Sequence, residues 1–252
     1  MMPIWSWFYR YYFRVTSDGW DQVPLGQPFL AVGSHNGGLA APDMYMLMYE
    51  WFQRYGAEQP IYGLMHPKVW EISPPIATMA MEFGAVLAHP RAASSALRQG
   101  HPVLVYPGGV EDVFRRHRWR HRINFASRTG FIKLALREKV PIVPVISAGA
   151  HDSLVVLGNL YSHIKPLGLP WLGGVDPLTL PVYLGLPWGV AIGPLPNIPA
   201  PVQIHNRICK PITFSYCGRD AANDRNYVWS CYQQVKQTMQ QQLLELVRER
   251  QV

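Results

Sequence analysis

The chain has 252 residues, of which 48% are hydrophobic and only 15% charged, and it contains nine Trp, thirteen Tyr and nine Phe. Charged residues usually make up roughly a quarter of a soluble protein, so this chain can build a large core and still expose apolar surface. Its net charge of +7 favours an anionic membrane surface or a phosphorylated ligand as partner, and the lack of a recognisable nucleic-acid motif argues against nucleic acid.

The first fifteen residues, MMPIWSWFYRYYFRV, combine aromatic side chains with two arginines. They lack the ~7–15-residue apolar core and the small-residue cleavage site of a secretory signal, so we expect a protein that is not secreted. The pattern is typical of an interfacial N-terminal anchor, and equally of an ordinary amphipathic helix packed on the domain.

Short apolar runs that suit strands alternate with segments that suit helices. The expected strands are residues 29–34, 85–88, 101–106 and 141–147, and the expected helices are residues 42–55, 91–99 and 127–138. Pro144 suggests that the last of these strands lies at a sheet edge. The alternation predicts an α/β fold, which we expect to be a single layered domain over residues 1–252 with a mixed, mostly parallel sheet flanked by helices.

Residues 166–202 form an apolar segment that is rich in Pro and Gly. Repeated prolines exclude one continuous membrane-spanning helix, and a long irregular segment is unusual in a compact domain. We expect it either to wrap the core or to dip into the outer layer of a bilayer. Residues 223–250 predict a C-terminal surface helix packed by one face, with apolar positions at Val228, Tyr232, Val235, Met239, Leu243 and Leu246.

His35 and Asp43 stand on either side of a glycine pair, in the stretch SHNGGLAAPD directly after the first expected strand. A neutral imidazole can accept a proton near neutral pH, and a carboxylate on its other nitrogen would stabilise the imidazolium that forms. In an extended chain the two residues would lie ~25 Å apart, so Gly37 and Gly38 would have to fold the loop back. The alternative is an aspartate that caps its own helix beside a histidine in a turn.

The stretch VLVYPGGVED, residues 103–112, runs from a strand into a glycine pair and two acids. Backbone N–H groups in such a turn can hold an anion or a developing oxyanion. Gly108 and Gly109 are therefore oxyanion candidates. An ordinary strand-to-loop turn would have the same sequence.

Basic residues form two further groups. Five arginines lie in the stretch VFRRHRWRHR, and guanidinium groups match phosphate geometry, so Arg115 and Arg116 are anion-binding candidates. Arg128 and Lys133 fall near the amino end of an expected helix, where the helix itself favours anions. For any one arginine, a solvated basic loop is the alternative.

Cysteine and histidine spacing gives no metal site. Three cysteines, spaced widely, fit neither a disulfide framework nor a zinc site, and we expect a reducing compartment. His117 and His121 have i,i+4 spacing, but no acid completes the metalloprotease arrangement.

Taken in order, these motifs resemble the glycerolipid acyltransferase superfamily, and more narrowly its lysophospholipid and monoacylglycerol/diacylglycerol acyltransferase-like branch. The matching stretches are Ser-His-Asn-Gly-Gly with Pro-Asp at 42–43, Tyr-Pro-Gly-Gly at 106–109, Arg-Thr-Gly-Phe at 128–131 and Val-Pro-Ile-Val-Pro-Val at 140–145. The family usually separates its histidine and aspartate by four residues, whereas Ala40 stands at that place here. The Pro-Gly-Gly turn replaces the common Pro-Glu-Gly and resembles the neutral-lipid branch. An acid usually follows the glycine pair in this family, so the resemblance also implies Glu111 or Asp112 at the substrate- and anion-binding site.

The resemblance implies an O-acyltransferase that moves a fatty acyl group from a thioester donor, acyl-CoA or acyl carrier protein, to the hydroxyl of a glycerolipid or related lipid. His35 would be the general base and Asp43 would orient it, while Arg128, with Arg115 or Arg116, would hold phosphates. No cofactor is implied beyond the co-substrate, and we expect a peripheral or monotopic protein on the cytoplasmic side of an anionic membrane. A thioesterase or other ester transferase, and a non-catalytic membrane lipid-binding protein with this fold, are the alternatives.

Overall fold

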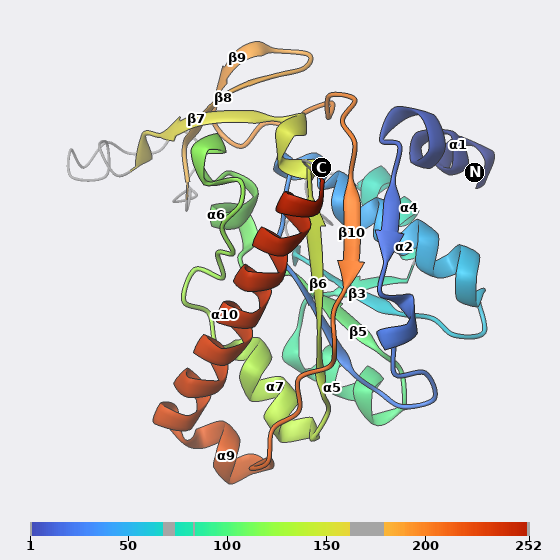
Figure 1. The fold of residues 1–252 in the computed structure, drawn as a ribbon, viewed down its shortest axis with the longest axis vertical. Helices are drawn as coiled ribbons and strands as arrows, with labels where there is room; N and C mark the ends of the chain where they lie inside the picture. Colours follow the sequence, from blue (N-terminus) through green and yellow to red (C-terminus); the bar gives the residue numbers. More distant parts are fainter. Residues whose placement is uncertain (1, 68–73, 83, 162–178, 251–252) are drawn as a thin grey trace.

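A seven-stranded sheet lies at the centre of the computed structural model, which describes residues 2–67, 74–82, 84–161 and 179–250 (Figure 1). The strand order is β1–β10–β6–β2–β5–β3–β4, and every pairing is parallel except β10 with β6. The predicted mixed, mostly parallel sheet is therefore confirmed. Its strands are β1 (Thr16–Asp18), β2 (Leu30–Gly33), β3 (Tyr62–Met65), β4 (Ala85–Leu87), β5 (Val103–Val105), β6 (Ile142–Ala148) and β10 (His205–Ile208).

Helices cover both faces of this sheet (Figure 1). They are α1 (Met2–Trp7), which continues as a π-helical turn (Phe8–Tyr12), α2 (Pro42–Tyr55), α4 (Pro74–Glu82), α5 (Pro90–Arg98), α6 (Gly109–Val113), α7 (Gly130–Glu138), α9 (Arg219–Asn223) and α10 (Arg225–Glu249). Four 3₁₀ turns lie at Trp20–Gln22, Gly38–Ala40, His117–Trp119 and Ala150–Ser153.

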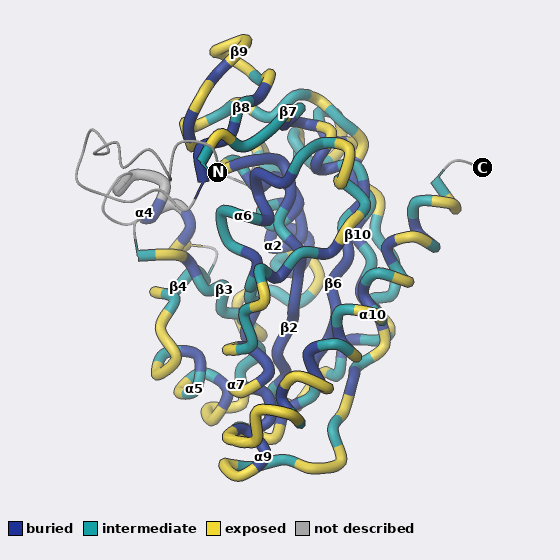
Figure 2. The backbone as a smooth tube through the Cα atoms, turned by 90° about the vertical axis from the view of Figure 1, so that its left-hand side faces the viewer, coloured by how far each residue is buried: buried dark blue, intermediate teal, exposed yellow. Residues whose placement is uncertain are grey.

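Strand β2 shows how the sheet divides the core in two. Successive side chains of a strand point to opposite faces, and Leu30 and Val32 belong to the hydrophobic cluster with α5, α7 and α10. Ala31 belongs to the other cluster, with Leu47 and Trp51 of α2. All of these side chains are buried, and Figure 2 shows β2 and β6 as the buried centre of the molecule. The strand is apolar on both faces because helices cover both.

The C-terminal helix α10 packs by one face, as its periodicity predicts. The six apolar positions named from the sequence, from Val228 to Leu246, are all buried. Asp224 caps the helix, because its side chain accepts hydrogen bonds from the backbone N–H groups of Asn226 and Tyr227.

Strand β6 is central, so the expectation that Pro144 marks a sheet edge is wrong. The Pro144 carbonyl accepts a hydrogen bond from Cys209 N, and Cys209 follows Ile208, the last residue of β10. The N–H and C=O of one residue point to the same side of its strand. An N–H at position 144 would therefore point toward Cys209, the residue just after the end of β10. The missing donor therefore breaks no pairing within either ladder.

A second, three-stranded antiparallel sheet contains β7 (Val155–Asn159), β8 (Pro181–Gly185) and β9 (Gly189–Ile192). The composition of residues 166–202 predicts a segment without regular structure. Of these, residues 166–178 lie outside the described part of the chain, and β8 and β9 correct the expectation for the rest, because the two strands pair across a turn at Leu186–Trp188.

The N-terminal segment is packed on the domain and also exposes apolar side chains. Phe13 is buried beside Met46, with Trp5 and Phe8 packed against them, whereas Ile4, Trp7 and Tyr11 are exposed. The segment is thus packed on the domain, and the interfacial anchor stays a prediction. Within the described residues, no helix combines the length and the apolar character needed to cross a bilayer.

Candidate active site

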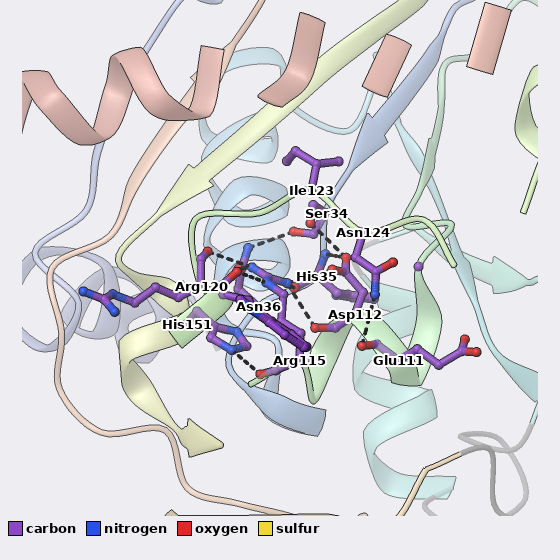
Figure 3. A network of polar contacts seen from close by, with 12 residues as sticks. Ser34, His35, Asn36, Glu111, Asp112, Arg115, Arg120, Ile123, Asn124 and His151 are labelled. Atoms are coloured by element: carbon purple, nitrogen blue, oxygen red, sulfur yellow. Dashed lines mark hydrogen bonds and ion pairs between the residues drawn. The ribbon is translucent and has the colours of Figure 1, made fainter. Parts of the chain in front are cut away.

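The candidate residues meet at the carboxyl edge of the parallel strands, where an open α/β sheet places its ligand site. Val32 of β2 pairs with Val105 of β5, and His35 and Gly108 each follow three residues later. Gly33 of β2 pairs with Val145 of β6 on the other side, and the turn after β6 carries His151. Strand register thus brings together three loops that are far apart in the sequence (Figure 3).

The His35 ring stacks on Tyr106, with centroids 4.2 Å apart and planes 18° apart. A side chain at Gly33 would exclude this arrangement, because a Cβ there would lie 2.3 Å from Tyr106 Cε1. Burial, reinforced by the charge of Arg115, lowers the pKa of His35 to about 3. The imidazole is therefore uncharged at neutral pH and has a free lone pair to accept a proton.

The loop between His35 and Asp43 folds back through left-handed backbone, as the glycine pair predicts. Gly37 and Gly38 have φ of 77° and 71°, and Ala41 has φ of 38°. Neither glycine has room for a side chain, because a Cβ at Gly37 would lie 2.6 Å from Ser153 Oγ, and one at Gly38 2.6 Å from Asn197 Oδ1. The 3₁₀ turn Gly38–Ala40 accommodates the residues by which this loop exceeds the usual four-residue separation of histidine and aspartate, and α2 begins two residues after it.

Asp43 is buried in the first turn of α2, and Asn36 connects it to the end of β2. Asn36 Nδ2 donates to Asp43 Oδ2 at 3.0 Å and to Ser34 O at 2.8 Å. Burial raises the pKa of Asp43 to about 7, although the Asn36 hydrogen bond opposes the shift. Among the described residues, His35 Nδ1 and Asp43 Oδ1 are both buried and have no hydrogen-bond partner. The His35–Asp43 pair therefore stays a prediction.

Arg115 and Asp112 form a buried ion pair under the His35 loop (Figure 3). Arg115 Nη1 lies 2.8 Å from Asp112 Oδ1 and donates to His35 O at 2.5 Å, and Nη2 donates to Asn36 Oδ1. Asp112 Oδ2 accepts from Ser34 Oγ at 2.9 Å and from His35 N at 2.6 Å. Burial raises the pKa of Asp112 to about 6, and the Arg115 charge limits the rise.

This pair corrects the prediction that Arg115 and Asp112 bind substrate. Arg115 is 6% exposed and Asp112 fully buried, and Arg115 Nε and Nη2 also donate to the carbonyls of Trp119 and Arg120. When the N–H groups of a guanidinium all donate to acceptors within the protein, none is free to bind a phosphate. The two residues hold the His35–Asn36 backbone in place instead.

His151 supports the same loop from β6. Its Nε2 lies 2.9 Å from the carbonyl oxygen of Arg115, which can only accept, so the proton is on Nε2. The Nδ1 lone pair then accepts from Gly37 N at 3.5 Å. Burial, followed by the Arg115 charge, lowers the pKa of His151 well below its usual value, so it acts as a neutral part of the framework.

The glycine turn after β5 is packed too tightly for side chains. A Cβ at Gly108 would lie 2.2 Å from Asn124 O, and Gly109 has φ of 55°. Arg128 spans this turn, because Nη1 donates to Pro107 O at 3.1 Å and to Gly108 O at 2.5 Å. Its Nη2 forms an ion pair with Glu111. Arg128 and Glu111 are half-exposed, unlike the Arg115–Asp112 pair.

Two of the predicted anion-binding residues lie apart from this cluster. Arg116 stacks over Trp119, 5.6 Å from the ring centroid, and Lys133 is exposed on α7. In the described residues we find no contact that ties Lys133 to the site. No group of three or more His, Cys, Asp or Glu side chains that could hold a metal ion occurs in the part of the chain that the structure describes.

No role follows from the sequence alone for three residues that build the site, namely Ser34, Asn36 and Tyr106. His151, which follows an expected strand, is expected either to line the same cleft or to form a local turn. Ser34 and Asn36 flank His35 directly, and a polar residue on each side of a candidate base is a signal that they hold its backbone. The stacking of Tyr106 and the contact of His151 with Arg115 depend on strand pairing, so local sequence carries no signal for them.

A family model described as Acyltransferase matches residues 14–148. The chain belongs to this Acyltransferase family. The matched region contains His35, Asp43 and the glycine turn.

Relatives of this acyltransferase chain extend the comparison. It is 28% identical over 246 residues to an uncharacterised protein of Mycobacterium tuberculosis, covering 97% of this chain and 65% of that protein. The chain thus spans less than two thirds of this relative's length. A human protein named DGAT1/2-independent enzyme synthesizing storage lipids is 27% identical over 176 residues, covering 67% of this chain and 52% of that protein.

One solved structure is also similar, the 1-acyl-sn-glycerophosphate (LPA) acyltransferase PlsC from Thermotoga maritima. The two chains are 15% identical, with a TM-score of 0.49, over 95% of this chain and 75% of the other.

Proposed function

We propose that this chain transfers a fatty acyl group from a thioester, acyl-CoA or acyl carrier protein, to the hydroxyl of a glycerolipid, with His35 as general base. The observation that carries the proposal is the pair of buried, unpartnered atoms, Nδ1 of His35 and Oδ1 of Asp43. A buried polar atom without a partner is costly, so its presence at the carboxyl edge of the sheet suits a site that completes its contacts during reaction.

His35 takes the proton from the acceptor hydroxyl as the hydroxyl oxygen attacks the thioester carbonyl. The tetrahedral intermediate collapses, the carbon–sulfur bond breaks, and the imidazolium returns the proton to the thiolate. Backbone N–H groups of the turn at Gly108 and Gly109 stabilise the negative oxygen of the intermediate. The first N–H groups of α6 have no acceptor within the helix, which supports this role.

The ionised Asp43 is needed because a pKa of about 3 makes His35 a weak base by itself. A carboxylate beside the ring stabilises the imidazolium and so strengthens the base in the transition state. Hydrogen bonds of catalytic groups are often long without substrate and tighten as the complex forms, so the absent bond in the free protein is compatible with the role.

A neutral acceptor, such as a mono- or diacylglycerol, fits the turn better than a phosphorylated one. The Glu111 carboxylate pairs with Arg128 beside the turn and offsets the charge that a phosphate would need. The turn itself is Pro-Gly-Gly, with no acidic or basic side chain in its centre.

A non-catalytic lipid-binding protein is the second candidate, and the unusual spacing of His35 and Asp43, with Ala40 at the place of the family's aspartate, favours it. Purified His35→Ala and wild-type chains incubated with radiolabelled acyl-CoA and diacylglycerol decide between the two. We expect label in triacylglycerol with the wild type, and loss of at least about a thousandfold with His35→Ala at an unchanged melting temperature. Equal activity of the two chains would end the assignment of the base, and label in free fatty acid alone would identify a thioesterase.

A further inference from the structure

The small β7–β8–β9 sheet has one packed face and one face whose described side chains are exposed. Tyr183 and Ala191, a cross-strand pair, are buried against Val113, the last residue of α6, and Phe114, which follows it. Leu184 and Val190, the neighbouring pair, point to the opposite face. In antiparallel sheets the face turned to water is ordinarily polar, and this one is not.

This face continues into the turn that joins β8 to β9, whose residues are also exposed, and Figure 2 colours parts of β9 and of this turn as exposed. Its members have exposed fractions between 42% and 67%. We call it the outer face, and it consists of Leu184, Leu186, Trp188, Val190 and Ile192. A contiguous exposed apolar patch of this kind marks an interaction surface.

Hydrogen bonds hold the tip of the outer face in a fixed shape. Trp188 Nε1 donates to Pro196 O at 2.7 Å, and Ile198 N donates to Leu186 O at 2.8 Å. The exposed Trp188 ring and Leu186 side chain are thus presented by an ordered turn, so binding would not have to order them first.

A basic and aromatic cluster borders the outer face. Three guanidinium groups lie near the Trp119 ring. The distance to the ring centroid is 5.6 Å for Arg116, 4.8 Å for Arg118 and 5.7 Å for Arg122. We call these four residues the Trp119 cluster. It adjoins β7, because Arg116 Nη2 lies 4.0 Å from where a Cβ of Gly158 would stand.

The same sheet is attached to the candidate active site. Asn197, which follows β9, donates from Nδ2 to Gly37 O at 3.2 Å and accepts at Oδ1 from Ala40 N at 3.4 Å. Between these two contacts lies Leu39, an exposed apolar side chain in the His35–Asp43 loop. In Figure 1 the small sheet and α1 lie at the same end of the molecule.

We propose that the outer face and the Trp119 cluster together dock on the surface of an anionic lipid bilayer. Apolar side chains enter the boundary between headgroups and acyl chains, Trp suits that boundary, and guanidinium groups attract anionic headgroups. A second copy of this chain fits less well, because two chains of net charge +7 would repel each other. The inference rests on the proposed function for its lipid acceptor, which the bilayer would supply beside the His35 loop.

The first test measures sedimentation with vesicles of phosphatidylglycerol and phosphatidylcholine, which needs no enzymatic activity. Val190→Glu with Ile192→Glu should reduce the partition coefficient at least about tenfold. Leu244→Glu is the matched control, because Leu244 is 40% exposed on α10, and it should bind like the wild type. Arg118→Gln with Arg122→Gln should weaken binding to anionic vesicles and leave binding to pure phosphatidylcholine unchanged.

A second measurement serves if the double glutamate variant fails to fold. A solvatochromic maleimide dye on Val190→Cys, in a Cys217→Ser background, should shift to the blue with anionic vesicles, because the other two cysteines are buried. The dye on Leu244→Cys should not shift. The proposal is overturned if the double glutamate variant binds vesicles like the wild type, or if the dye at position 190 does not shift. It is also overturned if the glutamates break a dimer without any loss of vesicle binding. Acyl transfer without vesicle binding would overturn the docking proposal and leave the proposed function intact. Vesicle binding without acyl transfer would overturn the proposed function and leave the docking proposal intact.

Discussion

Arg115→Met tests the conclusion that Arg115 holds the framework rather than the substrate. The substitution keeps the apolar stem and removes the cation that neutralises Asp112, a fully buried carboxylate 2.8 Å away. Removing one partner of a buried ion pair costs about 3–5 kcal/mol of unfolding free energy, because the other charge stays buried and unpaired.

The cost should depend on pH in a defined direction. Burial already raises the pKa of Asp112 to about 6, with the Arg115 charge opposing the rise, so the variant's pKa lies higher still. A carboxyl with a raised pKa is protonated at low pH, and its burial then costs little. As pH rises above about 4, the Asp112 carboxyl ionises in the unfolded chain but stays protonated in the folded chain. The free energy of unfolding therefore falls until the pH exceeds the pKa of Asp112 in the folded chain.

We therefore expect a destabilisation of about 2 kcal/mol at pH 5.5, from the lost hydrogen bonds to His35 and Asn36. At pH 8 we expect about 4 kcal/mol, since each further unit of raised pKa adds about 1.4 kcal/mol. Urea unfolding followed by circular dichroism at both pH values gives the two numbers.

Two controls accompany this measurement. Arg118→Met changes an exposed arginine and should cost less than about 0.5 kcal/mol at either pH. Arg115→Met combined with Asp112→Asn removes the buried charge and should abolish the pH dependence. A cost for Arg115→Met alone that is equal at pH 5.5 and pH 8 would refute the reasoning.

Three further predictions concern the site. Gly33→Ala places a Cβ 2.3 Å from the Tyr106 ring and should cost about 1–3 kcal/mol in urea unfolding, whereas Gly130→Ala, with open space around its Cβ, should be tolerated. The rate of acyl transfer should rise between pH 6 and pH 8 as Asp43 ionises, because burial raises its pKa to about 7. A flat profile in the wild type, or the same rise in Asp43→Asn, would contradict this. Arg128→Ala removes the hydrogen bonds to Pro107 O and Gly108 O beside the candidate oxyanion N–H groups, so it should lower the kcat of acyl transfer about tenfold or more with little change in melting temperature, and an unchanged kcat would remove this positioning role.

The fold class followed from sequence because helix and strand periods are local properties. The range 42–55 for α2 coincides with the observed Pro42–Tyr55, since a proline at the start and a glycine after the end are backbone effects. The prediction that the strand with Pro144 lies at a sheet edge was wrong because the position of a strand depends on its neighbours. The strand that pairs with β6 on the side of Pro144 is β10, more than 50 residues away in the sequence.

The sequence by itself determined the order of elements, the apolar face of α10 and the His35 loop, in which two glycines must supply left-handed backbone. Only the tertiary structure decided which charged residues are accessible. Arg115 and Arg128 look alike in the sequence, but one is buried in an ion pair with Asp112 and the other is half-exposed at the glycine turn. The physical reason is that burial, and with it the pKa of every group at the site, is set by what distant strands and loops bring against a side chain.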